Sequence, residues 1–70
     1  MNEKVANSVK GHRKNAGLTQ EELAAAMCVS RQTIISIEKG KYVPSLPLAL
    51  KLARFFKCSP NDVFTLEKEV

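Results

Sequence analysis

Apolar residues recur along the chain at spacings of three and four positions, and no segment alternates apolar and polar residues cleanly. This pattern is typical of amphipathic helices and predicts an all-α fold. Its interruptions define five helices, expected at about Glu3 to Asn15, from Gln20 to Met27, from Arg31 to about Lys39, over SLPLALKLARFFK, and from Ser59 onward. The tail TLEKEV is expected to be either a frayed end or a short C-terminal strand.

Residues with capping chemistry stand at the joints of this pattern. Thr19 and Glu22 have the spacing of a capping box, in which the hydroxyl accepts from a free backbone amide and the carboxylate reaches back. Ser30 is expected to be the next N-cap. Gly17 and Gly40 follow helical stretches and can adopt the left-handed conformation that ends a helix.

The second and third helices are separated by Cys28 and Val29 alone. A connection this short forces the two axes to cross steeply, and the alanines at positions 24–26 let the helices approach closely. This is the geometry of a helix-turn-helix, whose second helix protrudes from the body.

The third helix has a polar face of unusual composition. At about 100° per residue, Gln32, Ser36 and Lys39 lie opposite the apolar pair Ile34 and Ile37. Amides, hydroxyls and cations are the groups that bond base edges and phosphates in the major groove. An ordinary solvated face is the alternative, although such a face would normally carry Glu and Lys in salt-bridging order.

Size and charge narrow the function further. Seventy residues make one domain, residues 1–70, because so short a chain cannot support two cores. Eleven Lys and Arg against seven Asp and Glu give a net charge of +4, which favours a polyanionic partner. The apolar runs are too short for a membrane span and the N-terminus lacks a signal core, so we expect a soluble, cytoplasmic protein with no membrane partner.

Catalytic and metal chemistry is not expected. The chain has no Ser/His/Asp or Cys/His set that a small helical domain could assemble and no glycine-rich phosphate loop, so we predict no enzyme and no catalytic residue. His12 is the single histidine and neither cysteine has a partner at metal-ligand spacing, so we expect no metal and no cofactor. Cys28 and Cys58 are interpreted as small thiols in or near the core of a reduced protein.

The segment GLTQEELAAAMCVSRQTIISIEKGKYVPSLPLALKLARFF resembles the XRE family, the Cro/CI-type helix-turn-helix transcriptional regulators of phages and bacteria. The elements GLTQxELA, VSRQTI, IExGK and PSL occur in the family's order and spacing, and the resemblance covers about Val9 to Phe64. It implies a lambda-repressor-like DNA-binding fold with the motif core at residues 19–39, and double-stranded DNA as the partner.

The resemblance also implies roles for individual residues. The positions that contact bases in the family are occupied by Arg31, Gln32, Thr33 and Ser36. The positions that contact phosphates are occupied by Gln20, Lys39, Lys41 and Tyr42. Gln20 would also brace the recognition helix. Arg13 and Glu38 match an internal ion pair that ties the first helix to the third, so we expect them to be structural.

The C-terminal part of the chain has more large apolar residues than a short helix pair needs. We therefore expect residues 45–70 to form a homodimer interface that includes Leu48, Phe55, Phe64 and Leu66, although the last three could instead belong to the core. Two-fold symmetry would place two recognition helices one DNA turn apart and predicts a palindromic operator. The most direct function is a dimeric repressor.

Two other functions stay open at this stage. The same fold could serve as an antitoxin that neutralises a protein partner and represses its own operon. It could also be a helical adaptor with no role on DNA. Salt-dependent DNA binding distinguishes the adaptor from the other two.

Overall fold

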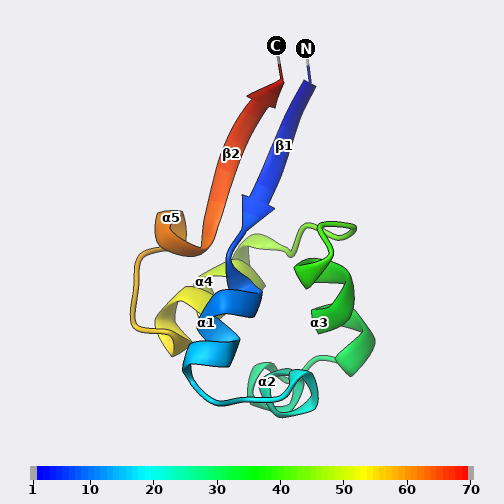
Figure 1. Ribbon diagram of the computed structural model, residues 1–70, viewed down its shortest axis with the longest axis vertical. Helices are drawn as coiled ribbons and strands as arrows, with labels where there is room; N and C mark the ends of the chain where they lie inside the picture. The colour runs from blue at the N-terminus through cyan, green and yellow to red at the C-terminus, as the bar shows by residue number, and fades with distance from the viewer. Residues whose placement is uncertain (1, 70) are drawn as a thin grey trace.

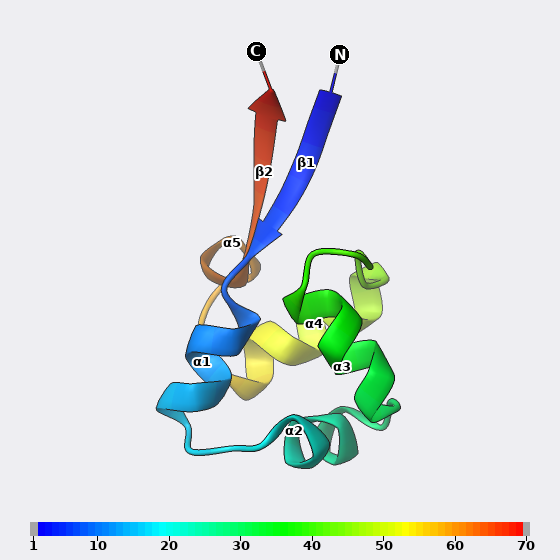
Figure 2. The same cartoon turned by 45° about the vertical axis from the view of Figure 1, so that its right-hand side comes forward.

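The computed structural model describes residues 2–69, which form five helices and a two-stranded sheet (Figure 1). In chain order the elements are β1 (Asn2–Asn7), α1 (Val9–Asn15), α2 (Gln20–Met27), α3 (Arg31–Glu38), α4 (Leu46–Phe55), α5 (Pro60–Val63) and β2 (Phe64–Glu69). The helices pack together as a body, and the sheet extends away from it as a narrow arm, which we call the ribbon (Figures 1 and 2). The predicted helical fold is therefore confirmed for the body, with α2 and α3 meeting at its lower end in Figure 1.

The ribbon joins the two ends of the chain. Its strands are antiparallel, with pairs that run from Asn2 opposite Glu69 to Asn7 opposite Phe64. The short C-terminal strand is confirmed, whereas the prediction that the first helix begins at about Glu3 is wrong. Residues 2–7 are extended because they pair with a segment from the far end of the chain, and local periodicity does not register such a contact.

The predicted starts of the second and third helices are confirmed in detail. Thr19 Oγ1 accepts from the Glu22 amide at 3.0 Å, and Glu22 Oε1 accepts from the Thr19 amide at 2.9 Å. Ser30 Oγ accepts from the Thr33 amide at 3.1 Å, so Ser30, the last of three residues between α2 and α3, caps the start of α3. These caps satisfy backbone donors that the first helical turn leaves free.

Left-handed residues end four of the helices among residues 2–69. They are Gly17, Cys28, Gly40 and Lys57. Cys28 has φ 61° and sits in the turn between α2 and α3, where a non-glycine residue carries some backbone strain. Its side chain is exposed, so the expectation that it lies in or near the core is wrong, whereas Cys58 is half-buried against the core.

The core lies between the five helices. Its buried apolar residues are Val9, Leu23, Ala24, Met27, Ile34, Ile37, Leu48, Leu52, Ala53 and Val63. Leu48 is only 9% exposed, so most of its side chain packs within its own chain, and its expected place in a dimer interface stays a prediction. Within residues 2–69, no helix has both the length and the apolar character that crossing a membrane requires.

Candidate nucleic-acid interface

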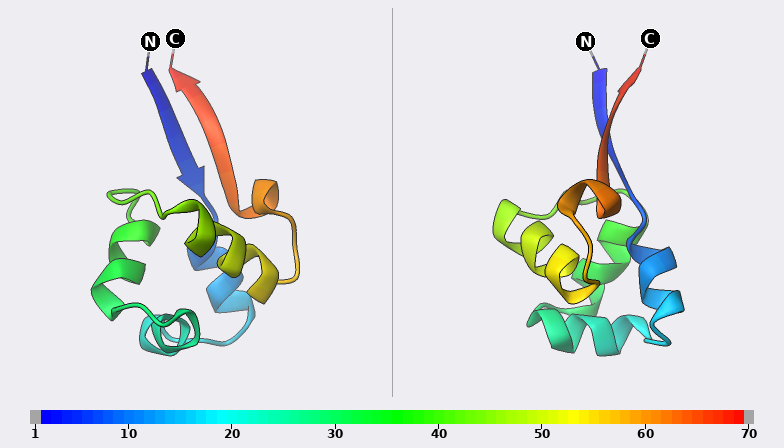
Figure 3. Two further views of the ribbon diagram at one scale, coloured as in Figure 1. Left: turned by 180° about the vertical axis from the view of Figure 1, so that it is seen from behind. Right: turned by 90° about the vertical axis from the view of Figure 1, so that its left-hand side faces the viewer.

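Helix α3 lies along one side of the body and turns one face inward and the other outward (Figures 1 and 3). Ile34 and Ile37 are fully buried, whereas Gln32 is exposed and Ser36 is half-buried. This is the orientation that the helical spacing predicts. The outward side chains are therefore available to a ligand that approaches α3 from the outside.

A shallow hollow of about 250 Å³ lies on this outward side. It is lined by Ser30, Gln32, Thr33, Ser36 and Tyr42. Gln32 Nε2 donates to Ser36 Oγ at 3.4 Å, which is long for a hydrogen bond and leaves the amide easily redirected. Tyr42 is 46% exposed. The hollow thus gathers uncharged donors and acceptors, and it places Tyr42 beside residues expected to contact bases.

The hydroxyl and the backbone amide of Thr33 are both engaged at the start of α3. Its hydroxyl lies 2.9 Å from Ser30 Oγ, and its backbone amide donates to the same serine. The threonine is also half-buried. Thr33 therefore contributes to the cap of α3, and its methyl group is the part best suited to an outside contact.

Arg31 lies in a different place from the other expected base-contacting residues. It lines a second hollow of about 560 Å³, together with residues of α1 and of the start of α2: Lys10, Arg13, Thr19, Gln20 and Glu21. Lys10 is exposed and was not expected at the site. It stands one helical turn before Arg13, and this i,i+3 spacing was the signal in the sequence that could have identified it.

Cations also stand at the other end of α3. Lys39 and Lys41 are exposed just beyond its last turn, on either side of Gly40. The outward face of α3 is therefore bordered by positive charge at both ends. Uncharged polar groups between two basic regions match the layout of a duplex, in which base edges lie between two phosphate backbones.

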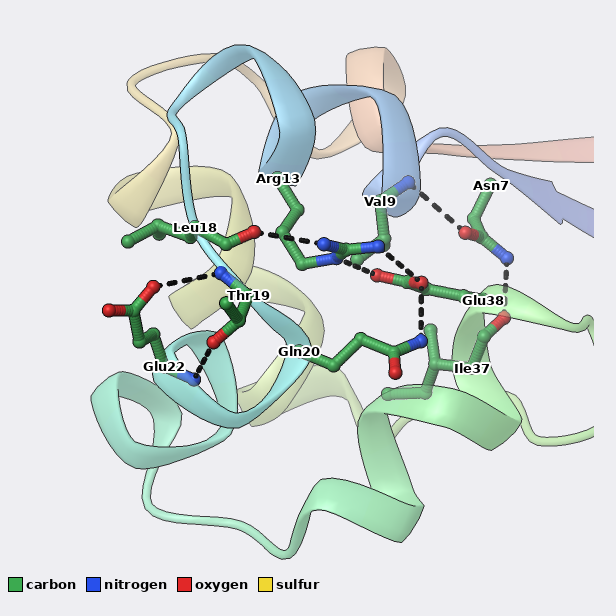
Figure 4. Close-up of polar contacts among 9 residues, drawn as sticks. All are labelled: Asn7, Val9, Arg13, Leu18, Thr19, Gln20, Glu22, Ile37 and Glu38. Carbon is green, nitrogen blue, oxygen red and sulfur yellow. Dashed lines mark hydrogen bonds and ion pairs between the residues drawn. The ribbon is translucent and has the colours of Figure 1, made fainter.

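A buried ion pair holds α3 against α1 (Figure 4). Arg13 Nε donates to Glu38 Oε2 at 2.7 Å and Arg13 Nη2 donates to Glu38 Oε1 at 3.2 Å. The two side chains are 10% and 4% exposed. The ion pair implied by the resemblance is present, and its two parallel bonds fix the end of α3 in position as well as in charge.

Gln20 of α2 also contacts Glu38. Its Nε2 donates to Glu38 Oε1 at 3.1 Å. Arg13 Nη1 meanwhile donates to the Leu18 carbonyl at 2.9 Å, in the segment that leads into α2. The carboxylate of Glu38 is thus shared by α1 and α2, and Gln20 braces the recognition helix from the edge of the second hollow.

The environment of Glu38 shifts its acidity. Burial alone would raise the pKa of its carboxyl, but the hydrogen bonds from Arg13 and Gln20 and the positive charges of Arg13 and Lys10 outweigh burial and lower the pKa below its ordinary value. The same contact with Glu38 raises the pKa of Arg13. Both shifts favour the charged pair.

The lowered pKa of Glu38 predicts acid sensitivity. A carboxyl that is more acidic in the folded chain stabilises the fold above its unfolded pKa, about 4.3, and this contribution is lost as the pH falls through the lower folded value. We expect the free energy of unfolding of the wild type to fall over this range. In Glu38→Gln, the part of this fall in the free energy of unfolding that comes from protonation of Glu38 should be absent. Urea titrations from pH 7 to pH 2.5 would measure it, and identical pH slopes for the two proteins would contradict the assignment.

Two short helices joined by the three-residue turn Cys28 to Ser30, the second with an outward polar face bordered by cations, define a helix-turn-helix unit suited to DNA. A helix-turn-helix family profile matches residues 9–63. The chain belongs to the XRE-type helix-turn-helix family of DNA-binding transcriptional regulators. Members of this family are regulators of transcription, not enzymes.

Similar proteins occur in archaea and bacteria. The chain is 54% identical over 63 residues to the uncharacterized HTH-type transcriptional regulator MJ0272 of Methanocaldococcus jannaschii, covering 90% of this chain and 96% of that protein. It is 51% identical over 63 residues to the uncharacterized HTH-type transcriptional regulator YgzD of Bacillus subtilis, with the same coverage of 90% and 96%.

Two solved structures have the same fold. The restriction-modification controller protein C.AhdI from Aeromonas hydrophila superposes with a TM-score of 0.69 at 31% identity, over 77% of this chain and 78% of that one. The clp gene regulator ClgR from Corynebacterium glutamicum gives a TM-score of 0.70 at 28% identity, over 77% of this chain and 57% of that one.

Proposed function

We propose that the chain is a sequence-specific regulator that binds duplex DNA as a homodimer, with α3 in the major groove, and represses transcription by occupying a palindromic operator. The observation that carries this proposal is the outward face of α3, with uncharged polar groups at its centre and cations at both ends. Amides and hydroxyls read base edges, and cations attract phosphates. A regulator seated on an operator excludes polymerase or another regulator from the same site.

The base-reading role is assigned to the residues around the first hollow. Gln32 is exposed there, and a glutamine amide can bond N6 and N7 of adenine together. Ser36 supplies a hydroxyl that can donate or accept, and the Thr33 methyl can meet a thymine methyl. Arg31 is placed to reach a guanine or the adjoining backbone, and Tyr42 to contact the edge of the groove beside Gln32.

The phosphate role is assigned to both borders of α3. Lys10 and Gln20 line the second hollow near the N-terminal end, whereas Lys39 and Lys41 follow the C-terminal end. Contacts with the phosphates of both DNA strands, one at each end of α3, would fix the depth and angle of α3 in the groove. Affinity should then fall steeply with salt, because each neutralised phosphate releases counterions.

The dimer proposal is supported by α4, which has apolar residues on two opposite sides. Leu48 and Leu52 face the core, whereas Leu46 and Leu50 lie about 160° and 200° from Leu48 at 100° per residue and are 70% and 46% exposed. Val43, just before α4, is 57% exposed. We propose that Val43, Leu46 and Leu50, here called the α4 outer stripe, form the centre of the two-fold interface.

The other residues expected at the interface differ in accessibility. Phe55 is 40% and Leu66 is 65% exposed, so both can contribute at the edge of an interface. Phe64 is half-buried against the core. The α4 outer stripe begins two residues after Lys41, so the proposed interface lies close in sequence to the C-terminal end of α3.

Selection of bound duplexes from a randomised DNA pool, at about physiological salt, tests the proposal as a whole. Non-specific binding by basic residues is suppressed under these conditions. The proposal requires enrichment of a palindrome whose half-sites lie about 34 Å apart, one helical turn. A folded protein that enriches no sequence would refute sequence-specific reading, and enrichment of isolated half-sites would refute the dimer.

Gln32→Ala is expected to weaken binding to the selected site by about 1 to 3 kcal/mol, because a bidentate contact to one base is lost. Sequence preference should relax at one position in each half-site. Fluorescence anisotropy on the selected site and on single-base variants measures both effects. Asn15→Ala removes an exposed amide at the end of α1 and serves as the control. Equal losses for Gln32→Ala on specific and random DNA would refute the reading role.

Lys41→Ala is expected to weaken binding to every sequence by a similar factor. The slope of the logarithm of affinity against the logarithm of salt concentration should become shallower by about one, because one phosphate contact is lost. Titrations at several salt concentrations measure this slope, with Lys14→Ala on α1 as the matched control. An unchanged slope for Lys41→Ala would show that Lys41 does not neutralise a phosphate.

A further inference from the structure

The last residue of β1, Asn7, contacts two helices through the two ends of its side-chain amide (Figure 4). Its Oδ1 accepts from the Val9 backbone amide at 3.1 Å, which caps the start of α1. Its Nδ2 donates to the Ile37 carbonyl at 2.9 Å, thirty positions away in the final turn of α3. The side chain is half-buried, so this second bond is partly shielded from water.

The acceptor of this bond lies at a sensitive place on the recognition helix. The Ile37 carbonyl also accepts from the Gly40 amide at 2.9 Å, in the turn that ends α3. The next residue, Glu38, is held by Arg13 and Gln20. The C-terminal end of α3 is therefore fastened at two successive residues, once by the ion pair and once by Asn7.

Asn7 also belongs to the ribbon, because it pairs with Phe64 as the last pair of the ladder before the body. Its neighbour Ser8 is tied in a different direction. The Ser8 amide donates to the Val63 carbonyl at 2.9 Å and Ser8 Oγ donates to the Asp62 carbonyl at 3.0 Å, both in α5. Two adjacent side chains thus anchor the base of the ribbon, Asn7 to α3 and Ser8 to α5.

We propose that Asn7 is a positioning residue for DNA reading, which fixes the C-terminal end of α3 relative to the ribbon and to α1. This inference rests on the proposed reading of bases by α3. A helix of eight residues is only about 12 Å long, so a small shift at one end changes the angle at which Gln32 and Ser36 meet a base. Base contacts require closer geometry than phosphate contacts, and loss of the tether should therefore reduce specific binding more than non-specific binding.

Asn7→Asp separates the two functions of the side chain. The new carboxylate still offers an oxygen to the Val9 amide, at a helix start where negative charge is favourable. It cannot donate to the Ile37 carbonyl and instead places a negative group against it. Ser8→Ala is the matched control, since it removes a neighbouring hydrogen bond between a side chain and a backbone carbonyl that leads to α5 and not to α3.

Binding is measured on the selected duplex and on random duplex, at a temperature where circular dichroism shows both variants to be folded. Asn7→Asp should lose about tenfold in affinity for the selected duplex, a loss on the scale of one hydrogen bond, with little change on random DNA. Ser8→Ala should leave the ratio of the two affinities unchanged. Equal losses on both duplexes for Asn7→Asp, or an equal change of the ratio in Ser8→Ala, would overturn the proposal.

A second measurement needs no DNA and separates failure of the tether from failure of the proposed function. Amide hydrogen exchange at Gly40 and Lys41, which donate into the last turn of α3, should become severalfold faster in Asn7→Asp than in the wild type, relative to Leu52 in the core. If exchange at Gly40 and Lys41 becomes faster only by the same factor as exchange at Leu52, the tether is refuted. If Asn7→Asp does not fold, Asn7→Ser, whose shorter side chain can still accept from Val9 but not reach Ile37, replaces it in both measurements.

Discussion

Glu38→Ala is expected to lower the free energy of unfolding by about 3 to 5 kcal/mol, the usual loss when one partner of a buried ion pair is removed. The guanidinium of Arg13 would remain almost buried with no opposing charge, and the Gln20 amide would lose its acceptor. Native domains are stable by only about 0.05 to 0.15 kcal/mol per residue. A loss of this size would therefore remove much of the stability of a 70-residue chain.

Urea denaturation followed by circular dichroism at neutral pH measures this effect. Glu21→Ala, which removes an exposed acid from the first turn of α2, is the control and should lose less than about 1 kcal/mol. Glu38→Gln should lie between the two, because its amide oxygen can still accept from Arg13. If Glu38→Ala lowers the free energy of unfolding no more than Glu21→Ala does, the ion pair positions α3 but contributes little to stability.

If the chain forms the proposed dimer, Leu46→Glu is expected to convert it to monomers and to weaken binding to a palindromic operator by about 10²- to 10⁴-fold, since two linked half-site contacts become independent. Two-fold symmetry would bring the two new carboxylates together in an apolar interface. The substitution should not disturb the monomer, because Leu46 is 70% exposed and an acid in the first turn of α4 suits the helix dipole.

Leu66→Glu tests the alternative location of the interface, because Leu66 is a leucine of similar exposure on the ribbon. Sedimentation equilibrium of both variants, with operator titrations of each, decides between the two locations. Dissociation by Leu46→Glu alone supports the α4 outer stripe as the interface. Dissociation by Leu66→Glu alone would move the interface to the ribbon and α5.

The helix-turn-helix was predictable because its signals are local. The capping box at Thr19, the cap at Ser30 and the left-handed turn at Gly40 each depend on residues within one helical turn. The buried side of α3 follows from the spacing of Ile34 and Ile37 in the same way. Nothing from a distant part of the chain was needed to place these features.

Strand β1 could not be predicted from local pattern, because its partner lies at the other end of the chain. One local signal was nevertheless present. Asn7 and Ser8 are both residues that favour helix starts, and they indicate that α1 begins at Val9 rather than near Glu3. The apolar residues Val5 and Val9 share a helical spacing by coincidence, since Val5 lies in β1 and Val9 begins α1.

The side of α3 on which the site lies was predictable from the sequence. Which residues lie together in each hollow was not. The outward position of Gln32 and Ser36 follows from helix geometry alone. The approach of Tyr42 to them depends on the path of the loop after α3, and the separation of Arg31 depends on where α1 packs. In α4, by contrast, the core-facing side was predictable from spacing alone, because Leu46 and Leu50 fall on the side opposite Leu48 in a helical projection.

The ribbon pairs β1, which precedes the helices of the body, with β2, which follows them, and this arrangement bears on the order of folding during synthesis. When a ribosome makes this chain, β1 emerges before any helix and has no partner until residues 64–69 have also emerged. The helices between them can therefore pack together before β1 has its partner strand. The bond from Asn7 can be made at that stage, but the strand that holds Asn7 in place is completed last, so the recognition helix is formed before its attachment to the ribbon is secured.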